Sequence, residues 1–187
     1  MIYAQVHLTL PSWVHQEVDA NAVCADDDSK VALAIRLSRI NVERQTGGPF
    51  GAAIFDAAGR LISIGVNRVI PLNCTVAHAE MMAFMTAQQR LQRHRLDLDD
   101  GQQFTLATSS QPCCQCYGAT IWSGIHTLLI GARSSDVEEL TEFDEGPLPG
   151  DWIGELERRR IAVRRDIRRD EARAVLAGYG KTGGQSY

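Results

Sequence analysis

Apolar positions recur at near-helical spacing between residues 31 and 42. A helix-start signal at 26–29 precedes this run and Gly47-Gly48 follows it, which predicts a long helix between them. The pattern then changes to short apolar runs. The runs at 50–55 and 60–66 lie on either side of a turn composition and predict a β-hairpin.

The rest of the chain continues to alternate helix-like and strand-like segments. The predicted elements are a helix at 77–93, a strand at 104–108, a helix at 113–122, a strand at 127–132, a helix at 152–160, a strand at 161–163 and a last helix at 170–176. Strands that alternate with helices form layered α/β sheets. We therefore expect one α/β domain spanning 1–187, in which residues 1–25 form an N-terminal extension anchored by Trp13 and Val14.

Composition narrows the class of protein. Of the 187 residues, 44% are hydrophobic and the formal net charge is only -4, so a disordered chain is excluded. The longest apolar runs fall short of a membrane helix and the first residues lack the pattern of a secretory signal, so we expect a cytoplasmic protein without a membrane span. The slightly acidic charge makes nucleic acid an unlikely main partner.

Two short motifs hold side chains that bind metals or move protons. His78 and Glu80 stand in the first turn of one predicted helix, and Cys113 and Cys116 stand three residues apart in the first turn of another. Residues three apart, as Cys113 and Cys116 are, face one side of a helix, and the positive end of the helix favours thiolates. An imidazole and two thiolates suit zinc, and three protein ligands leave one tetrahedral position for water.

These motifs match the H-x-E…P-C-x-x-C signature of zinc nucleobase deaminases, in which the Glu is not a ligand. In this interpretation, zinc-bound hydroxide attacks an amidine-like ring carbon, and Glu80 carries the proton to the ring nitrogen and then to departing ammonia. A closed structural zinc site would need a fourth ligand. Cys74 suits that role better than Cys114, which adjoins Cys113 in the sequence. A metal-free core with buried cysteines is the third interpretation.

Further motifs accompany these ligands. They are Gly47-Gly48-Pro49-Phe50-Gly51-Ala52, Asn67, Ala77-His78-Ala79-Glu80, Pro112-Cys113-x-x-Cys116, Gly118-Ala119 and Trp122. On these motifs, over about residues 30–145, the chain resembles the cytidine and deoxycytidylate deaminase superfamily, and within it most closely the bacterial guanine deaminases. The resemblance implies a three-layer α/β/α fold with a five-stranded mixed sheet, one zinc ion per subunit and a homodimer. It also implies hydrolysis of guanine to xanthine and ammonia.

The resemblance assigns roles around the base as well. The residues it implies for base binding are Phe50, Asn67, Ala79, Trp122, Asp144 and Tyr187, with Glu145 as a second catalytic group. Asp144 and Glu145, the acidic pair, also fit an ordinary solvated loop, because acidic side chains are mostly exposed. Residues 178–187 would form a C-terminal tail that closes an active site, exchanged between subunits in a dimer.

Other functions share parts of this pattern. A tRNA adenosine deaminase uses the same zinc motif, and the arginine-rich stretch 158–173 could contact phosphates, although such charge runs are mostly solvated surface. Deamination of cytosine or of an aminotriazine is a further enzymatic alternative. A non-catalytic module held together by structural zinc belongs to another class, and it would tolerate the loss of Glu80.

Overall fold

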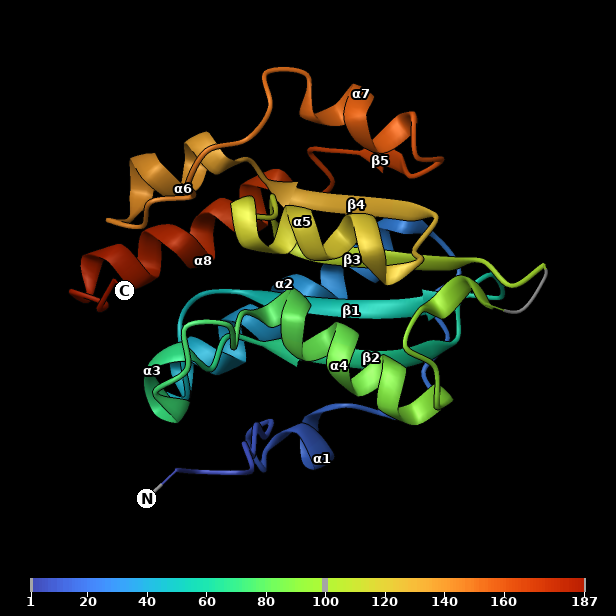
Figure 1. Ribbon diagram of the computed structural model, residues 1–187. Coiled ribbons are helices and arrows are strands. Elements are labelled where there is room, and N and C mark those ends of the chain that lie inside the picture. Colours follow the sequence, from blue (N-terminus) through green and yellow to red (C-terminus); the bar gives the residue numbers. More distant parts are fainter. Residues whose placement is uncertain (1, 99–100, 187) are drawn as a thin grey trace.

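The computed structural model describes residues 2–98 and 101–186, and a five-stranded sheet lies at its centre (Figure 1). The strands are β1 (Gly51–Asp56), β2 (Leu61–Val66), β3 (Phe104–Ser110), β4 (Thr127–Ala132) and β5 (Ala162–Arg164). Their order is β2-β1-β3-β4-β5, with β1 antiparallel to both neighbours and β3, β4 and β5 parallel. The mixed sheet is the one expected.

Helices cover both faces of this sheet. They are α1 (Val14–Glu17), α2 (Asp27–Glu43), α3 (Val69–Leu72), α4 (Ala79–Leu91), the short 3-10 helix η1 (Leu96–Leu98), α5 (Cys114–Ser123), α6 (Ser134–Leu140), α7 (Trp152–Glu157) and α8 (Arg169–Lys181). Figure 1 shows α4 and α5 in front of the sheet and α2 behind it. The three-layer α/β/α fold is thereby confirmed.

The two cores follow from the alternation of side chains along β1. Ala53 and Phe55 face the core shared with α2 and α8, whereas Ala52 and Ile54 face the core shared with α4 and α5. All four side chains are fully buried. The apolar runs that the sequence places in strands therefore pack against helices on both faces of the sheet.

The N-terminal extension packs on the body of the protein. Trp13 is 4% exposed and belongs to the core beneath α2, where Val14 packs beside it. Glu17 pairs with Arg36 and Arg44 of the α2 region. The prediction that Trp13 and Val14 anchor this segment is confirmed.

The end of the chain differs from the prediction. Residues 178–181 continue α8 rather than forming a tail, so the tail begins only after Lys181. Gly178 and Gly180 favour the end of a helix at this point, because glycine is a poor helix former. At Gly180, however, a Cβ atom would lie 2.2 Å from the carbonyl oxygen of Leu140, so glycine is what allows α8 to approach α6. Tyr187 lies outside the described residues.

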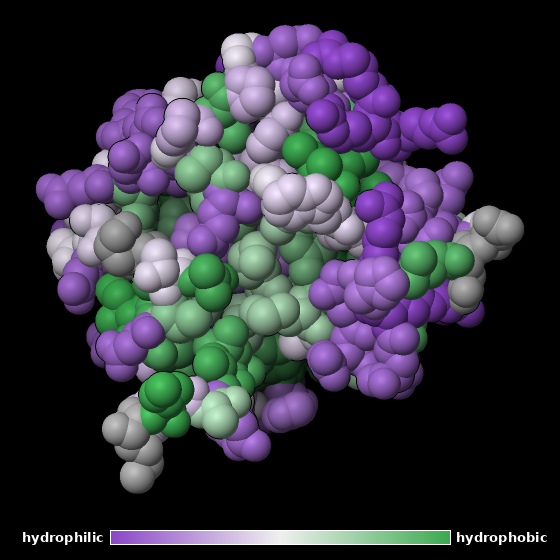
Figure 2. All heavy atoms as spheres, in the orientation of Figure 1, coloured by the Kyte–Doolittle hydropathy of each residue, from purple (hydrophilic) through white to green (hydrophobic). Residues whose placement is uncertain are grey.

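The arginine-rich stretch is largely paired within the chain. Hydrophilic side chains gather over α7 and β5, at the top of the view in Figure 2. Arg158 and Arg159 bind Glu155, Arg164 binds Asp27, and Arg168, Arg169 and Arg173 bind the carboxylates Asp28, Asp136 and Glu139 among others.

Within the part of the chain that is described, no helix combines the length and apolarity that a membrane crossing requires.

Candidate active site

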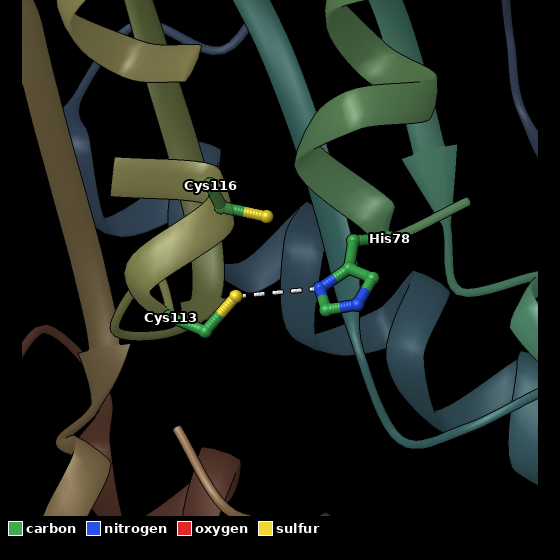
Figure 3. A group of neighbouring side chains, drawn as sticks. All are labelled: His78, Cys113 and Cys116. Atoms are coloured by element: carbon green, nitrogen blue, oxygen red, sulfur yellow. Dashed lines mark hydrogen bonds between the residues drawn. The ribbon is translucent and has the colours of Figure 1, made fainter. Parts of the chain in front are cut away.

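Two helix starts bring the predicted metal ligands together. His78 is the residue directly before α4, and Cys113 is the residue directly before α5, with Cys116 one turn further along. Strand β3 ends at Ser110, so the chain enters α5 at the carboxyl edge of the sheet. Figure 3 shows the three side chains converging from the two helix starts. The helix geometry predicted from the sequence thus places all three ligands.

The distances suit a single metal ion. The ligand atoms of His78, Cys113 and Cys116 all lie within 4.8 Å of one another, and His78 Nδ1 is 3.4 Å from Cys113 Sγ. Zinc–sulfur bonds of about 2.3 Å and zinc–nitrogen bonds of about 2.0 Å put tetrahedral ligand atoms roughly 3.5 Å apart. Small side-chain adjustments would therefore seat one zinc ion on these three atoms.

The electrostatics of this donor set also favour a cation. The hydrogen bond from Cys116 is the largest cause that lowers the pKa of the Cys113 thiol to about 4. The same bond, together with burial, raises the pKa of Cys116. Burial disfavours a charged His78, but its bond to the Cys113 sulfur and the nearby charges outweigh that effect and raise its pKa. The Cys113 thiolate thus lies between a protonated Cys116 and a protonated His78. A divalent cation bound at the same place can replace those two protons.

The described residues give no fourth protein ligand. Neither Cys74 nor Cys114 belongs to the group that can reach a common ion, and Cys114 is exposed. The closed structural site considered from the sequence is therefore not supported by the described part of the chain. The donor set instead has the three-ligand composition of catalytic zinc sites.

Glu80 lies beside the ligands without joining them. It is the second residue of α4, its side chain is 8% exposed, and it lines the same cavity as His78 and Cys113. Burial, reinforced by the charge on Cys113, raises the pKa of Glu80 to about 7. A carboxyl group with a pKa in this range can both accept and donate a proton near neutral pH.

Two of the ligands, His78 and Cys113, line a small cavity of about 90 Å³. Pockets for drug-sized molecules measure about 300–1,000 Å³, so this cavity suits a much smaller ligand. Its lining residues are Phe50, Asn67, Thr75, His78, Glu80, Gln111, Cys113, Phe143, Asp144 and Glu145. The structure thus brings most of the sequence-predicted site residues into one space.

The acidic pair divides into one buried and one exposed residue. Glu145 is only 7% exposed, and burial, with added repulsion from Cys113 and Glu80, raises its pKa to about 9. Asp144 is exposed, and its Oδ1 atom accepts a hydrogen bond from the Gly146 N–H in its own turn. The solvated-loop interpretation is therefore wrong for Glu145, and Glu145 is the better placed to meet a ligand.

Two expected base contacts lie outside the cavity. Trp122 is 73% exposed on the last turn of α5 and does not line the cavity of this chain, so its role as a wall for the base stays a prediction. The reason is that α5 runs away from the site, and the nine residues after Cys113 cover about 13 Å. Ala79 packs in the core between α4 and the sheet rather than lining the cavity.

Three lining residues were not predicted from the sequence, namely Thr75, Gln111 and Phe143. Gln111 directly follows β3, and a polar residue at the carboxyl end of a buried parallel strand is a signal that could have found it. Phe143 packs edge-on against Phe50, with ring centroids 5.1 Å apart, and stacks on Tyr179 of α8. Because these rings come from distant segments, no local pattern reveals that they meet.

The sequence match supplies the context for this geometry. Residues 25–132 match the family described as the cytidine and deoxycytidylate deaminase zinc-binding region. The chain is also 31% identical, over 71% of its length and 80% of the relative's, to the tRNA-specific adenosine deaminase of Buchnera aphidicola subsp. Schizaphis graminum.

Solved structures give a more extensive likeness. The guanine deaminase from Nitrosomonas europaea is 40% identical to this chain and superposes with a TM-score of 0.91, covering 97% of this chain and 99% of that one. A mutant of the protein NE0047 in complex with 8-azaguanine is 41% identical, with a TM-score of 0.90 and coverage of 95% and 98%. The likeness extends beyond the metal motifs to nearly the whole chain.

Proposed function

The chain belongs to the cytidine and deoxycytidylate deaminase family, and on this premise we propose that it converts guanine and water into xanthine and ammonia. It is a zinc-dependent nucleobase deaminase, and guanine is the substrate we assign to it. The observation that carries the assignment is one small cavity that joins Glu80 and two of the metal ligands, His78 and Cys113, to Asn67 and the buried Glu145.

His78, Cys113 and Cys116 would hold the zinc ion, as their spacing and charge suit it. Zinc bound there supplies a Lewis acid that can lower the pKa of a water from 15.7 to about 7. His78 and Cys113 line the cavity, so a zinc ion held by this group would lie next to the space that the substrate enters. These residues therefore decide where the reacting carbon must lie.

Glu80 moves the protons of the reaction. It accepts one proton from the attacking water and delivers it to the unprotonated ring nitrogen next to C2 of guanine. It then carries the second proton, from the new hydroxyl group on C2, to the amine, which leaves as ammonia as the C2–N bond breaks and the C2–O bond becomes a carbonyl. A C2–O bond replaces the lost bond, so guanine and water balance xanthine and ammonia. Burial of Glu80 keeps bulk water from competing for these protons.

The other end of the cavity would recognise the purine. The Asn67 amide offers a hydrogen bond to an edge of the base, and the Glu145 carboxyl group faces donors that cytosine lacks in the same arrangement. Phe50 and Phe143 provide an aromatic wall. The small cavity favours a free base over a nucleoside, which carries a sugar.

The relatives support the same substrate. The most extensive likeness reported above is to a guanine deaminase, and a mutant of NE0047 was solved in complex with 8-azaguanine, an analogue of guanine. The match to a tRNA adenosine deaminase is shorter and weaker. Pairing of the arginines near α7 and α8 with carboxylates of the chain itself also leaves fewer of them for phosphates.

The deciding experiment measures ammonia release by the zinc-loaded protein from guanine, guanosine, adenine, cytosine, cytidine, dCMP, an aminotriazine and a tRNA anticodon stem-loop. We expect guanine to give the highest kcat/KM and guanosine to give at least about 100-fold less, because a missing or blocked contact in a polar site is costly. Release from cytidine or from tRNA, but not from guanine, would overturn the substrate assignment.

The expected homodimer with exchanged tails stays a prediction. It adds a residue to the site only if Tyr187 reaches a cavity, and Tyr187 lies outside the described residues. Size-exclusion chromatography with light scattering, combined with turnover by a chain shortened after residue 181, tests it. A monomer that keeps full turnover without the tail would contradict the prediction.

A further inference from the structure

The Asn67 amide is held in one orientation by the backbone around it. Asn67 is 1% exposed, and its Oδ1 atom accepts hydrogen bonds from the N–H groups of Gly48 and Val69, both at 3.3 Å. Two donors on the same atom identify it as the oxygen of the amide. The oxygen edge therefore faces the backbone, and the amide nitrogen is the edge that a base in the cavity would meet.

A second buried amide holds the segment that carries these donors. Asn41 of α2 is fully buried, and its Nδ2 atom donates to the carbonyl oxygens of Gly48, at 2.9 Å, and Asn67, at 3.0 Å. Gly48 is thereby clamped between the two asparagines. The approach is close, because a Cβ atom at Gly47 would lie 1.9 Å from the Asn67 carbonyl oxygen. Asn41 thus sets where the Asn67 backbone lies without reaching the cavity.

The connection continues from Asn41 to the N-terminal segment. Thr46 Oγ1 donates to Asn41 Oδ1 at 2.7 Å and accepts a hydrogen bond from Trp13 Nε1 at 2.9 Å. Arg68, which follows Asn67, donates to the carbonyl oxygens of Thr46 and Thr9. Two independent contacts therefore tie the N-terminal segment to the turn at Thr46.

We propose that Asn41 and Thr46, completed by Trp13, are positioning residues for base recognition, because they fix the orientation of the Asn67 amide. This inference rests on the proposed function, since it assigns a base contact to Asn67. The bonds of Asn41 to Gly48 and Asn67 are buried and those of Thr46 are part-buried, and hydrogen bonds in such a connected chain polarise one another, so the loss of one weakens the others. The N-terminal segment then has a role in substrate binding although it contributes no group to the cavity.

A double-mutant cycle tests this connection. We measure kcat, KM and the Kd of 8-azaguanine for the wild type, Thr46→Val, Asn67→Ala and the double variant. Thr46→Val removes the hydroxyl at nearly constant shape, and we expect KM and Kd to rise about 10-fold with kcat changed less than about two-fold. In the Asn67→Ala background, the same substitution should change Kd by less than about two-fold, because its effect passes through Asn67.

Additive effects in the cycle would overturn the proposal, as would an unchanged Kd in Thr46→Val. Thr46→Ser keeps the hydroxyl and should restore the wild-type Kd. Thr108→Val is the matched control, because it removes a buried threonine hydroxyl that donates to Leu129 within the sheet. If this control raises Kd as much as Thr46→Val does, the effect is general loosening and the proposal is wrong.

A second variant covers the case in which Thr46→Val does not fold. Trp13→Phe keeps a buried ring and removes only the N–H donor, and we expect Kd to rise about three-fold in the same Asn67-dependent way. The kinetic part of the cycle uses whichever base the wild type deaminates best, and if that base is not guanine, its KM replaces the Kd of 8-azaguanine as the measure of binding. A different preferred base would overturn the proposed function and still test the positioning role. Independence from Asn67 would overturn the positioning role and leave the function intact.

Discussion

The two ends of the cavity are built differently. At the metal end, His78, Glu80, Cys113 and Cys116 stand at or near the starts of two helices, within two short stretches of sequence. At the base end, the side chains come from separate loops and are held by distant partners, such as Asn41 behind Asn67. The difference teaches that the reaction depends on local helix geometry, whereas the choice of base depends on long-range packing.

The sharpest way to break the metal end is to remove a ligand. Cys113→Ala should lose zinc and reduce kcat/KM by about 1,000-fold or more, because the Lewis acid is lost with the ion. Cys114→Ala is the matched control, since its side chain is exposed and lies outside the ligand group. Metal analysis and ammonia release on both variants check this. Equal losses of zinc in the two variants would contradict the assignment of ligands.

Glu80→Gln separates binding of the metal from chemistry. We expect the variant to keep its zinc while kcat falls at least about 100-fold, since a positioned acid or base contributes that much. Zinc content measured on the same sample as the kinetics checks both halves. Full turnover in this variant would favour a non-catalytic role for the carboxyl group, and loss of zinc would make it a ligand.

The base end is tested by its two acidic neighbours. Glu145→Ala should lower kcat/KM for guanine by about 10- to 100-fold, the cost of a lost hydrogen bond to a charged or strongly polar group. Asp144→Ala should change it less than about three-fold, because that side chain is exposed and binds its own turn. Zinc content should stay unchanged in both. A larger loss in Asp144→Ala would reverse the assignment.

The smallest expected effect on activity concerns the contact between α6 and α8, whose charged residues do not line the cavity. The buried carboxyl group of Asp136 in α6 accepts hydrogen bonds from Arg169 and Arg173 of α8 and from the Arg133 N–H, and the bond to Arg169 is the largest cause that lowers its pKa. Its unfolded pKa is about 3.9. The ionised group therefore stabilises the fold above about pH 4, and this contribution is lost as the pH falls further.

Asp136→Asn should accordingly lower the free energy of unfolding by about 2 kcal/mol at pH 7, the size expected when a carboxyl group with a lowered pKa can no longer ionise. The difference from the wild type should shrink as the pH falls below about 4, while kcat/KM at pH 7 changes less than about three-fold. Denaturant unfolding at several pH values measures this. Asp166→Asn, which affects an exposed pair with Arg133, is the control and should cost less than about 1 kcal/mol. A difference that does not vary with pH would contradict the account.

The sequence predicted most of the fold because its signals are local. Asp26 and Ser29 form the capping box that starts α2, and the turn between β1 and β2 lies where its composition indicates. The metal end was predicted for the same reason, as the ligands and Glu80 occupy two helix starts. In each case the information needed lies within about one helical turn of the residue concerned.

The remaining features depend on contacts between distant segments. The predicted last helix at 170–176 is shorter than α8, and no local pattern shows that Gly180 lets α8 approach Leu140 of α6. Trp122 was assigned to the cavity from a motif, whereas its place is decided by the direction of α5. The hydrogen bonds that hold Gly48 between Asn41 and Asn67 join residues far apart in the chain, and the pattern of hydrophobic positions does not predict them.

X-ray absorption spectroscopy at the zinc edge of the loaded protein tests the central claim most directly, because the claim is that three protein ligands leave one position for solvent. We expect two sulfur scatterers at about 2.3 Å and two lighter nitrogen or oxygen scatterers at about 2.0 Å. The spectrum of Cys114→Ala should be the same. Three sulfur scatterers would contradict this claim. So would a spectrum that stays the same when 8-azaguanine is added, if the protein also shows no turnover.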